Sequence, residues 1–115
     1  TRHIIGAPQL QRMKRDAILV NTARGGLIDT QALIQALRRQ QIGGAALDVL
    51  EQESGWYYHD CSAIPLAFPE LEELERFDNV ILTPHLAWLS EEATAEMVYR
   101  SMESCRRFMN GGEIK

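Results

Sequence analysis

The sequence predicts an α/β fold built on an open parallel sheet. Short apolar runs alternate along the chain with amphipathic stretches, in the order strand, helix, strand. The run AILV at residues 17–20 also lacks the alternation of polar and apolar residues that a strand with one wet face shows. It therefore predicts a strand covered on both faces, as in parallel sheets.

The predicted elements follow from apolar periodicity, helix caps and chain breakers. The first half of the chain is predicted to form a short helix over 8–13, a strand over 17–20, a helix over 30–40 and a strand over 44–49. A long loop over 50–66 follows, and then an acidic helix that begins near residue 69, a strand over 79–82 and a final helix from 90 to about 110. Asp29 and Ser90 stand where the N-caps of the two longer helices belong.

The two longer helices differ in how their apolar residues are arranged. In the helix over 30–40, Leu33 and Leu37 belong to one apolar stripe that can cover the sheet, and Gly43 follows its end. The final helix carries two adjacent rows, so we expect it to be covered on more than one side. The rows are Ala93, Met97, Ser101 and Cys105, and Val98, Met102, Cys105 and Met109.

Composition narrows the class of protein. The chain is 45% hydrophobic with a net charge of −4, which is typical of one globular domain. It has no run of like charges that would bind nucleic acid or a membrane surface. It also has no apolar segment of the ~18 residues that a membrane span needs. Cys61 and Cys105 lack metal-ligand spacing. We therefore expect a cytoplasmic protein with free thiols, no metal site, and neither nucleic acid nor membrane as partner.

Three predicted strands end in residues that carry chemistry. The first ends at Arg24, the second at Asp48 with Glu53 just beyond, and the third at His85. The carboxyl ends of parallel strands meet at one edge of a sheet, where ligands bind. A guanidinium matches a carboxylate bidentately, and a carboxylate beside an imidazole stabilises its protonated form. Each residue also has a structural interpretation, as a salt bridge, a turn cap or a solvated charge.

Three sequence blocks resemble the NAD-dependent D-2-hydroxyacid dehydrogenases. They are NTARGGLID, AALDVLEQE and NVILTPHLAW, and together they extend the resemblance over essentially the whole chain. The long loop EQESGWYYHDCS and Trp88 are most similar to the D-lactate dehydrogenase branch. The resemblance implies the second half of a Rossmann-type, doubly wound NAD-binding domain, with NAD as cofactor and a small 2-keto or 2-hydroxy acid such as pyruvate as substrate.

The resemblance also implies roles for individual residues. Arg24 anchors the carboxylate of the 2-keto acid, His85 protonates its carbonyl oxygen, and Glu53 is the carboxylate partner of His85. If Glu53 does not pair with His85, Glu51 is the alternative partner. The remaining implied residues are Asp48, Thr22 and Ala23 at the nicotinamide end of the cofactor and Trp88 in the substrate pocket. Family members commonly dimerise, so a homodimer is expected. We interpret His3 and His59 as surface histidines.

One family motif is absent from these 115 residues. There is no G-x-G-x-x-G, the backbone cradle for the pyrophosphate of a dinucleotide. We therefore expect residues 1–115 to be a partial dinucleotide-binding domain with a C-terminal helix, without the glycine fingerprint or the substrate domain, and inactive alone. The alternative to an enzyme is a non-catalytic domain, either an orphan fragment or a dehydrogenase-like corepressor that binds partners.

Overall fold

The computed structural model describes residues 2–51, 53 and 69–111. The chain divides into two compact units, Thr1–His85 and Leu86–Lys115. Each unit is described by itself below.

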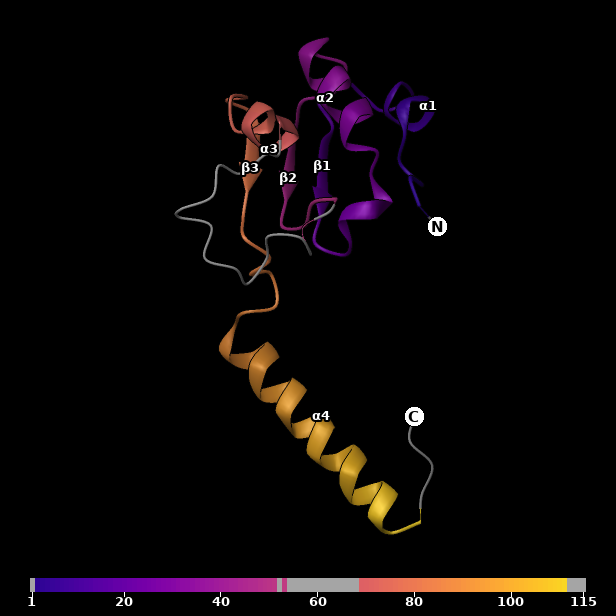
Figure 1. Ribbon diagram of the computed structural model, residues 1–115, viewed down its shortest axis with the longest axis vertical. Coiled ribbons are helices and arrows are strands. Elements are labelled where there is room, and N and C mark those ends of the chain that lie inside the picture. The colour runs from indigo at the N-terminus through magenta and orange to yellow at the C-terminus, as the bar shows by residue number, and fades with distance from the viewer. Residues whose placement is uncertain (1, 52, 54–68, 112–115) are drawn as a thin grey trace. The chain divides into compact units, whose positions relative to one another are not determined.

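The first unit is built on a parallel sheet (Figure 1). Its strands are β1 (Ile18–Asn21), β2 (Gly44–Leu47) and β3 (Val80–Leu82), in the order β1-β2-β3. The register aligns Leu19 of β1 with Ala45 of β2, which in turn pairs with Val80 of β3. All three strands therefore run in one direction and bring their carboxyl ends to one edge of the sheet, which confirms the predicted α/β fold.

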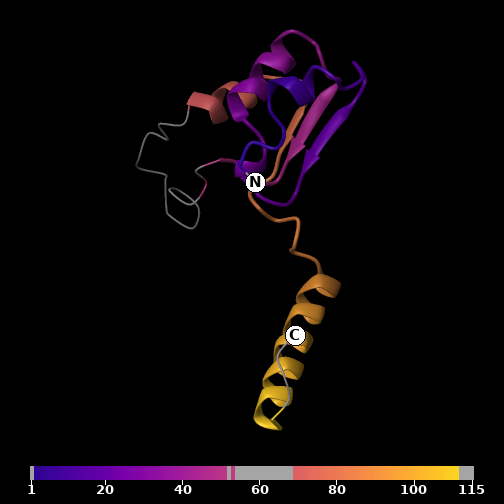
Figure 2. The same cartoon turned by 90° about the vertical axis from the view of Figure 1, so that its right-hand side faces the viewer.

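Helices lie on one side of this sheet (Figure 2). They are α1 (Ala7–Leu10), α2 (Thr30–Arg38) and α3 (Pro69–Leu74), with a single 3₁₀ turn, η1 (Gly25–Leu27), after β1. The Asp29 side chain accepts from the Ala32 N–H at 3.0 Å, so the predicted cap of α2 is confirmed. The core between helices and sheet consists of buried aliphatic residues, namely Leu10, Ile28, Leu33, Ile34, Ala36, Leu37, Ile42, Ala45, Leu47 and Leu74.

The opposite side of the sheet is bare in the part of the chain that the structure describes. Ile18, Val20 and Ile81 are 60%, 62% and 65% exposed, respectively. Alternate residues of a strand point to opposite faces, and only one of the two sets meets the described helices. The prediction that residues 17–20 form a strand covered on both faces is therefore wrong for these residues.

The second unit contains one long helix, α4 (Glu91–Met109). The Ser90 side chain accepts from the Ala93 N–H at 3.1 Å, which confirms the predicted cap. Hydrogen bonds from Arg106 and then Arg107 lower the pKa of Glu103 to about 2. None of its described residues is buried, so the prediction that α4 is covered on more than one side is not met here.

The remaining predictions differ from the structure mainly at element ends. The first helix stops at Leu10 instead of residue 13, and β2 stops at Leu47 instead of residue 49. The short acidic helix from Pro69 is confirmed, whereas most of the predicted loop over 50–66 lies outside the described residues. Cys105 is an exposed free thiol, and Cys61 is not among the described residues. No described helix is long and apolar enough to cross a membrane.

Candidate active site

Backbone hydrogen bonds continue past the strands and align the three predicted site segments. The Asp48 N–H donates to the Asn21 carbonyl at 2.9 Å, and the His85 N–H donates to the Asp48 carbonyl at 2.9 Å. The ends of β1, β2 and β3 are thus joined in order. The structure therefore brings Asp48 and His85 together, next to the turn that leads to Arg24.

The turn after β1 is braced by a buried amide. Asn21, which is 6% exposed, accepts from the Ala23 N–H at 3.1 Å and donates from Nδ2 to the Arg24 carbonyl at 3.0 Å. This brace presents Thr22, Ala23 and Arg24 on the surface. The Arg24 guanidinium is exposed, and its Nη1 donates to the Ala23 carbonyl at 2.7 Å. Among the described residues, only this donor of the guanidinium has a partner, so the other donors can bind an anion.

Gly25 allows this turn to pack directly on the segment that follows β2. A Cβ on Gly25 would lie 2.0 Å from the carbonyl carbon and oxygen of Leu50, which no side chain can tolerate. A Cβ on Gly26 would meet no atom within 4 Å. Only the first glycine of the pair is required sterically, and it couples the Arg24 turn to the segment that carries Glu53.

His85 has an unusual backbone conformation. Its φ is 54°, in the left-handed region that is uncommon for residues other than glycine. Its N–H donates to the carbonyls of Asp48 and Thr83, each at 2.9 Å. Thr83 Oγ1 in turn donates to Asp48 Oδ1 at 2.5 Å, and Asp48 is only 5% exposed. Asp48 thus supports the turn at His85 through both its backbone and its side chain.

Glu53 lies against the His85 ring. Its Oε1 is 3.2 Å from His85 Nδ1, while its Oε2 accepts from the Leu50 N–H at 3.2 Å. Both side chains are partly buried, at 27% exposed for His85 and 19% for Glu53. The carboxylate is therefore held by its own turn, with one oxygen directed to Nδ1 of the imidazole.

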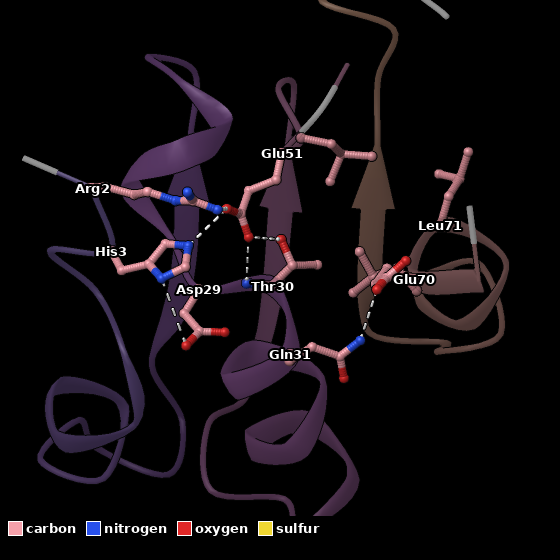
Figure 3. A pocket seen from close by; sticks show the side chains of 10 residues that line it. Arg2, His3, Asp29, Thr30, Gln31, Glu51, Glu70 and Leu71 are labelled. Atoms are coloured by element: carbon pink, nitrogen blue, oxygen red, sulfur yellow. Dashed lines mark hydrogen bonds and ion pairs between the residues drawn. The ribbon is translucent and has the colours of Figure 1, made fainter. Parts of the chain in front are cut away.

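Glu51, the alternative partner for His85, makes different contacts (Figure 3). Its Oε1 accepts from His3 Nε2 at 2.7 Å, and its Oε2 accepts from the N–H and Oγ1 of Thr30 at 3.2 and 3.0 Å. Burial would raise the pKa of Glu51, but the hydrogen bonds from His3 and Thr30 outweigh it and lower that pKa. His3, which we interpreted as a surface histidine, is 35% exposed, and its ring also contacts Glu51.

Trp88 belongs to the second unit and is 41% exposed, and its place in a substrate pocket stays a prediction. His59 lies outside the described residues. Sequence reasoning missed the Glu51 contacts. The only available signal was the Asp29-Thr30 pair that begins α2, whose N–H groups attract a carboxylate.

The residues at this edge suit one end of a dinucleotide. A buried carboxylate at Asp48 and the surface backbone of Thr22 and Ala23 are polar groups of the kind that a nicotinamide carboxamide needs. The pyrophosphate has no counterpart in the sequence, since no G-x-G-x-x-G occurs in it. A contact of Asp48, Thr22 and Ala23 with the nicotinamide end of the cofactor stays a prediction.

The family model for the D-isomer specific 2-hydroxyacid dehydrogenase NAD binding domain matches residues 1–87. The chain belongs to this family. The prediction of NAD as cofactor is confirmed at the level of the family, which is one of NAD-binding domains. The match includes the Arg24, Asp48, Glu53 and His85 positions and ends just before Trp88.

Individual relatives agree with the family assignment. The chain is 45% identical over 108 residues to the D-specific alpha-keto acid dehydrogenase of Enterococcus faecium, covering 94% of this chain and 34% of that protein. The structure is similar to D-lactate dehydrogenase with NAD⁺ from Lactobacillus jensenii, with a TM-score of 0.83, 38% identity, and coverage of 99% of this chain and 34% of that one.

A second solved structure is equally similar. It is the NAD-complexed D-isomer specific 2-hydroxyacid dehydrogenase of Lactobacillus delbrueckii ssp. bulgaricus, with a TM-score of 0.85, 39% identity, and coverage of 98% of this chain and 34% of that one. The chain thus spans about a third of the length of the proteins it matches. These neighbours confirm the Rossmann-type fold.

Proposed function

We propose that this chain is the catalytic-residue half of the coenzyme domain in an NAD-dependent D-2-hydroxyacid dehydrogenase, which reduces a small 2-keto acid. The observation that carries the proposal is the 3.2 Å approach of Glu53 Oε1 to His85 Nδ1 at the carboxyl edge of the sheet. A paired imidazole is suited to donating a proton during carbonyl reduction.

His85 is the proton donor in this reaction. NADH, when bound, would supply the hydride for the carbonyl carbon of the 2-keto acid. Negative charge then develops on the carbonyl oxygen, and the protonated His85 ring gives its Nε2 proton to that oxygen. The Glu53 carboxylate on the Nδ1 side stabilises the protonated ring before transfer. In the oxidation direction neutral His85 removes the hydroxyl proton.

Arg24 binds the substrate carboxylate in this proposal. Its exposed guanidinium extends from a turn whose backbone is held by Asn21 and Gly25. A planar guanidinium pairs with both oxygens of a carboxylate, which fixes the direction of the adjacent carbonyl. Pyruvate is the proposed substrate, because a similar solved structure is a D-lactate dehydrogenase and pyruvate is the keto acid of lactate.

The remaining roles complete the proposal. Asp48 and the backbone of Thr22 and Ala23 contact the nicotinamide end of the cofactor, and the buried position of Asp48 supports this role. Trp88 forms part of the substrate pocket. The enzyme works in the cytoplasm as a homodimer.

The substitution His85→Ala in the complete dehydrogenase tests the proposal. Because the proton is donated only in the transition state, we expect turnover to fall by about 10² or more while the affinity for NADH stays near that of the unchanged enzyme. Steady-state kinetics with pyruvate and fluorescence titration with NADH measure the two quantities. Turnover near that of the unchanged enzyme would exclude His85 as the acid.

A further inference from the structure

Glu51 and Glu53 are two residues apart in the sequence, but their side chains contact different parts of the unit. Glu53 faces His85, whereas Glu51 lies in a cavity of about 200 Å³ next to the N-terminus of α2 (Figure 3). Both Glu51 oxygens accept hydrogen bonds there, from His3 and from Thr30, and Arg2 Nη2 lies 3.5 Å from Oε1. The segment that carries Glu53 is thus attached to the body of the unit through Glu51.

His3 extends this attachment to the turn that carries Arg24. The His3 N–H donates to the Gly26 carbonyl at 2.9 Å, and the Ile5 N–H donates to the Leu27 carbonyl at 3.0 Å. The N-terminal segment therefore runs beside η1, which begins directly after Arg24. One side chain, Glu51, is bonded both to this segment and to α2.

We propose that Glu51 is a positioning residue that holds the Arg24 turn and the Glu53 segment in place at the sheet edge. The inference rests on the proposed function, since it concerns the alignment of the residues that act in it. Glu51 itself touches neither His85 nor the substrate. It acts by fixing where the backbone of Leu50 and Glu51 lies against Gly25.

The contacts explain why this position needs an ionised carboxylate. Its oxygens accept hydrogen bonds from an imidazole, a hydroxyl and a backbone N–H, whereas a neutral amide has only one oxygen that can accept. The Glu51 side chain is 18% exposed, so water replaces few of these bonds. The Thr30 N–H is also among the unsatisfied donors at the start of α2, which favours negative charge.

Glu51→Gln in the complete dehydrogenase tests the inference, with Glu70→Gln as the matched control. Glu70 lines the same cavity, and its Oε1 accepts from Gln31 at 2.9 Å, so the control removes the same charge from the same cavity without touching the Glu53 segment. The measurements are kcat, the KM for pyruvate, the pH profile of reduction, and the NMR titration of the His85 ring.

For Glu51→Gln we expect kcat/KM for pyruvate to fall about tenfold, because a displaced anchor and a displaced proton donor both misalign the substrate. The pH at which reductase activity falls should also move down, in the same direction as for Glu53→Gln, because the Glu53 carboxylate would no longer be held as near to the His85 ring. Glu70→Gln should match the unchanged enzyme in both respects. Thr30→Val, which removes one donor to Glu51, should give a smaller change in the same direction and serves if Glu51→Gln does not fold.

The inference is overturned if folded Glu51→Gln, or Thr30→Val in its place, retains the unchanged kcat/KM, pH profile and His85 ring titration. It is also overturned if Glu70→Gln produces the same changes, since these would then come from charge alone. Failure of the proposed function has a different pattern, in which the unchanged enzyme reduces no 2-keto acid. The ring titration of His85 still decides the inference in that case, because it needs no turnover.

Discussion

His85 shows how single residues at this edge depend on their neighbours. Its left-handed backbone costs of the order of 1 kcal/mol and is compensated by the carbonyls of Asp48 and Thr83, which both accept its N–H. The ring is thereby turned toward Glu53. At the scale of residues, the turns at Arg24 and His85 are each held by a buried polar side chain, that of Asn21 and that of Asp48, respectively.

The pairing of Glu53 with His85 leads to a prediction on pH dependence. With Glu53→Gln, the imidazole loses a carboxylate at 3.2 Å that favours its protonated form. The acid form then disappears at lower pH, so the pH at which reductase activity falls should move down. A pH profile of kcat/KM for pyruvate measures the shift. An unmoved or alkaline profile would remove Glu53 as the partner of His85.

Arg24→Lys tests the carboxylate anchor. Lysine keeps the positive charge but loses the planar fork, so we expect the KM for the keto acid to rise about tenfold and turnover to fall through misorientation. Steady-state kinetics with pyruvate separate the two effects, and the KM for NADH serves as the internal control. An unchanged KM for pyruvate would show that Arg24 has a structural role only.

At the scale of elements, the turn after β1 and the segment after β2 form one packed unit. Gly25 lies against the Leu50 backbone, and the buried Asn21 amide braces the residues between β1 and Gly25. The paired glycines are equivalent in the sequence, but they face different surroundings in the structure.

The two glycines should therefore respond differently to a methyl group. Gly25→Ala forces the Leu50 backbone away, and overpacking of this kind costs about 1–3 kcal/mol or more, so the melting temperature should fall and activity with it. Gly26→Ala meets no atom within 4 Å and should leave stability within about 0.5 kcal/mol. Thermal melting of the two variants side by side decides the matter. Equal melting temperatures would contradict the close approach at Gly25.

At the scale of the whole molecule, an apolar surface dominates the described sheet. Ile18, Val20 and Ile81 are exposed on its bare face, and β1 pairs only with β2 among the described strands, which leaves one edge of β1 open. Exposed apolar faces and open strand edges promote association. The chain also lacks the glycine-rich backbone that binds a pyrophosphate.

We therefore expect the isolated 115-residue chain to self-associate and to bind NADH too weakly for calorimetry at micromolar concentrations. It should show no reduction of pyruvate or 2-ketobutyrate. Analytical ultracentrifugation measures the first property, and a clean, stable monomer would contradict it. Micromolar NADH binding would show a nucleotide site that does not need the glycine fingerprint, and the interpretation as half of a coenzyme domain would be abandoned.

The sequence by itself determined the elements whose signals are local. The caps at Asp29 and Ser90, the apolar runs of the strands and the break after β3 all depend on residues a few positions apart. Because parallel strands share one edge, the same signals also predicted that Arg24, Asp48 and His85 lie at that edge.

Only the tertiary structure decided what depends on contacts between distant segments. Glu51 and Glu53 have the same side chain and nearly the same position in the chain, but one bonds to Thr30 and His3 and the other approaches His85. The bare face of β1 and the different surroundings of Gly25 and Gly26 also depend on which distant segments pack against them. Such choices follow from register and packing across 20 to 50 residues, which no local periodicity encodes.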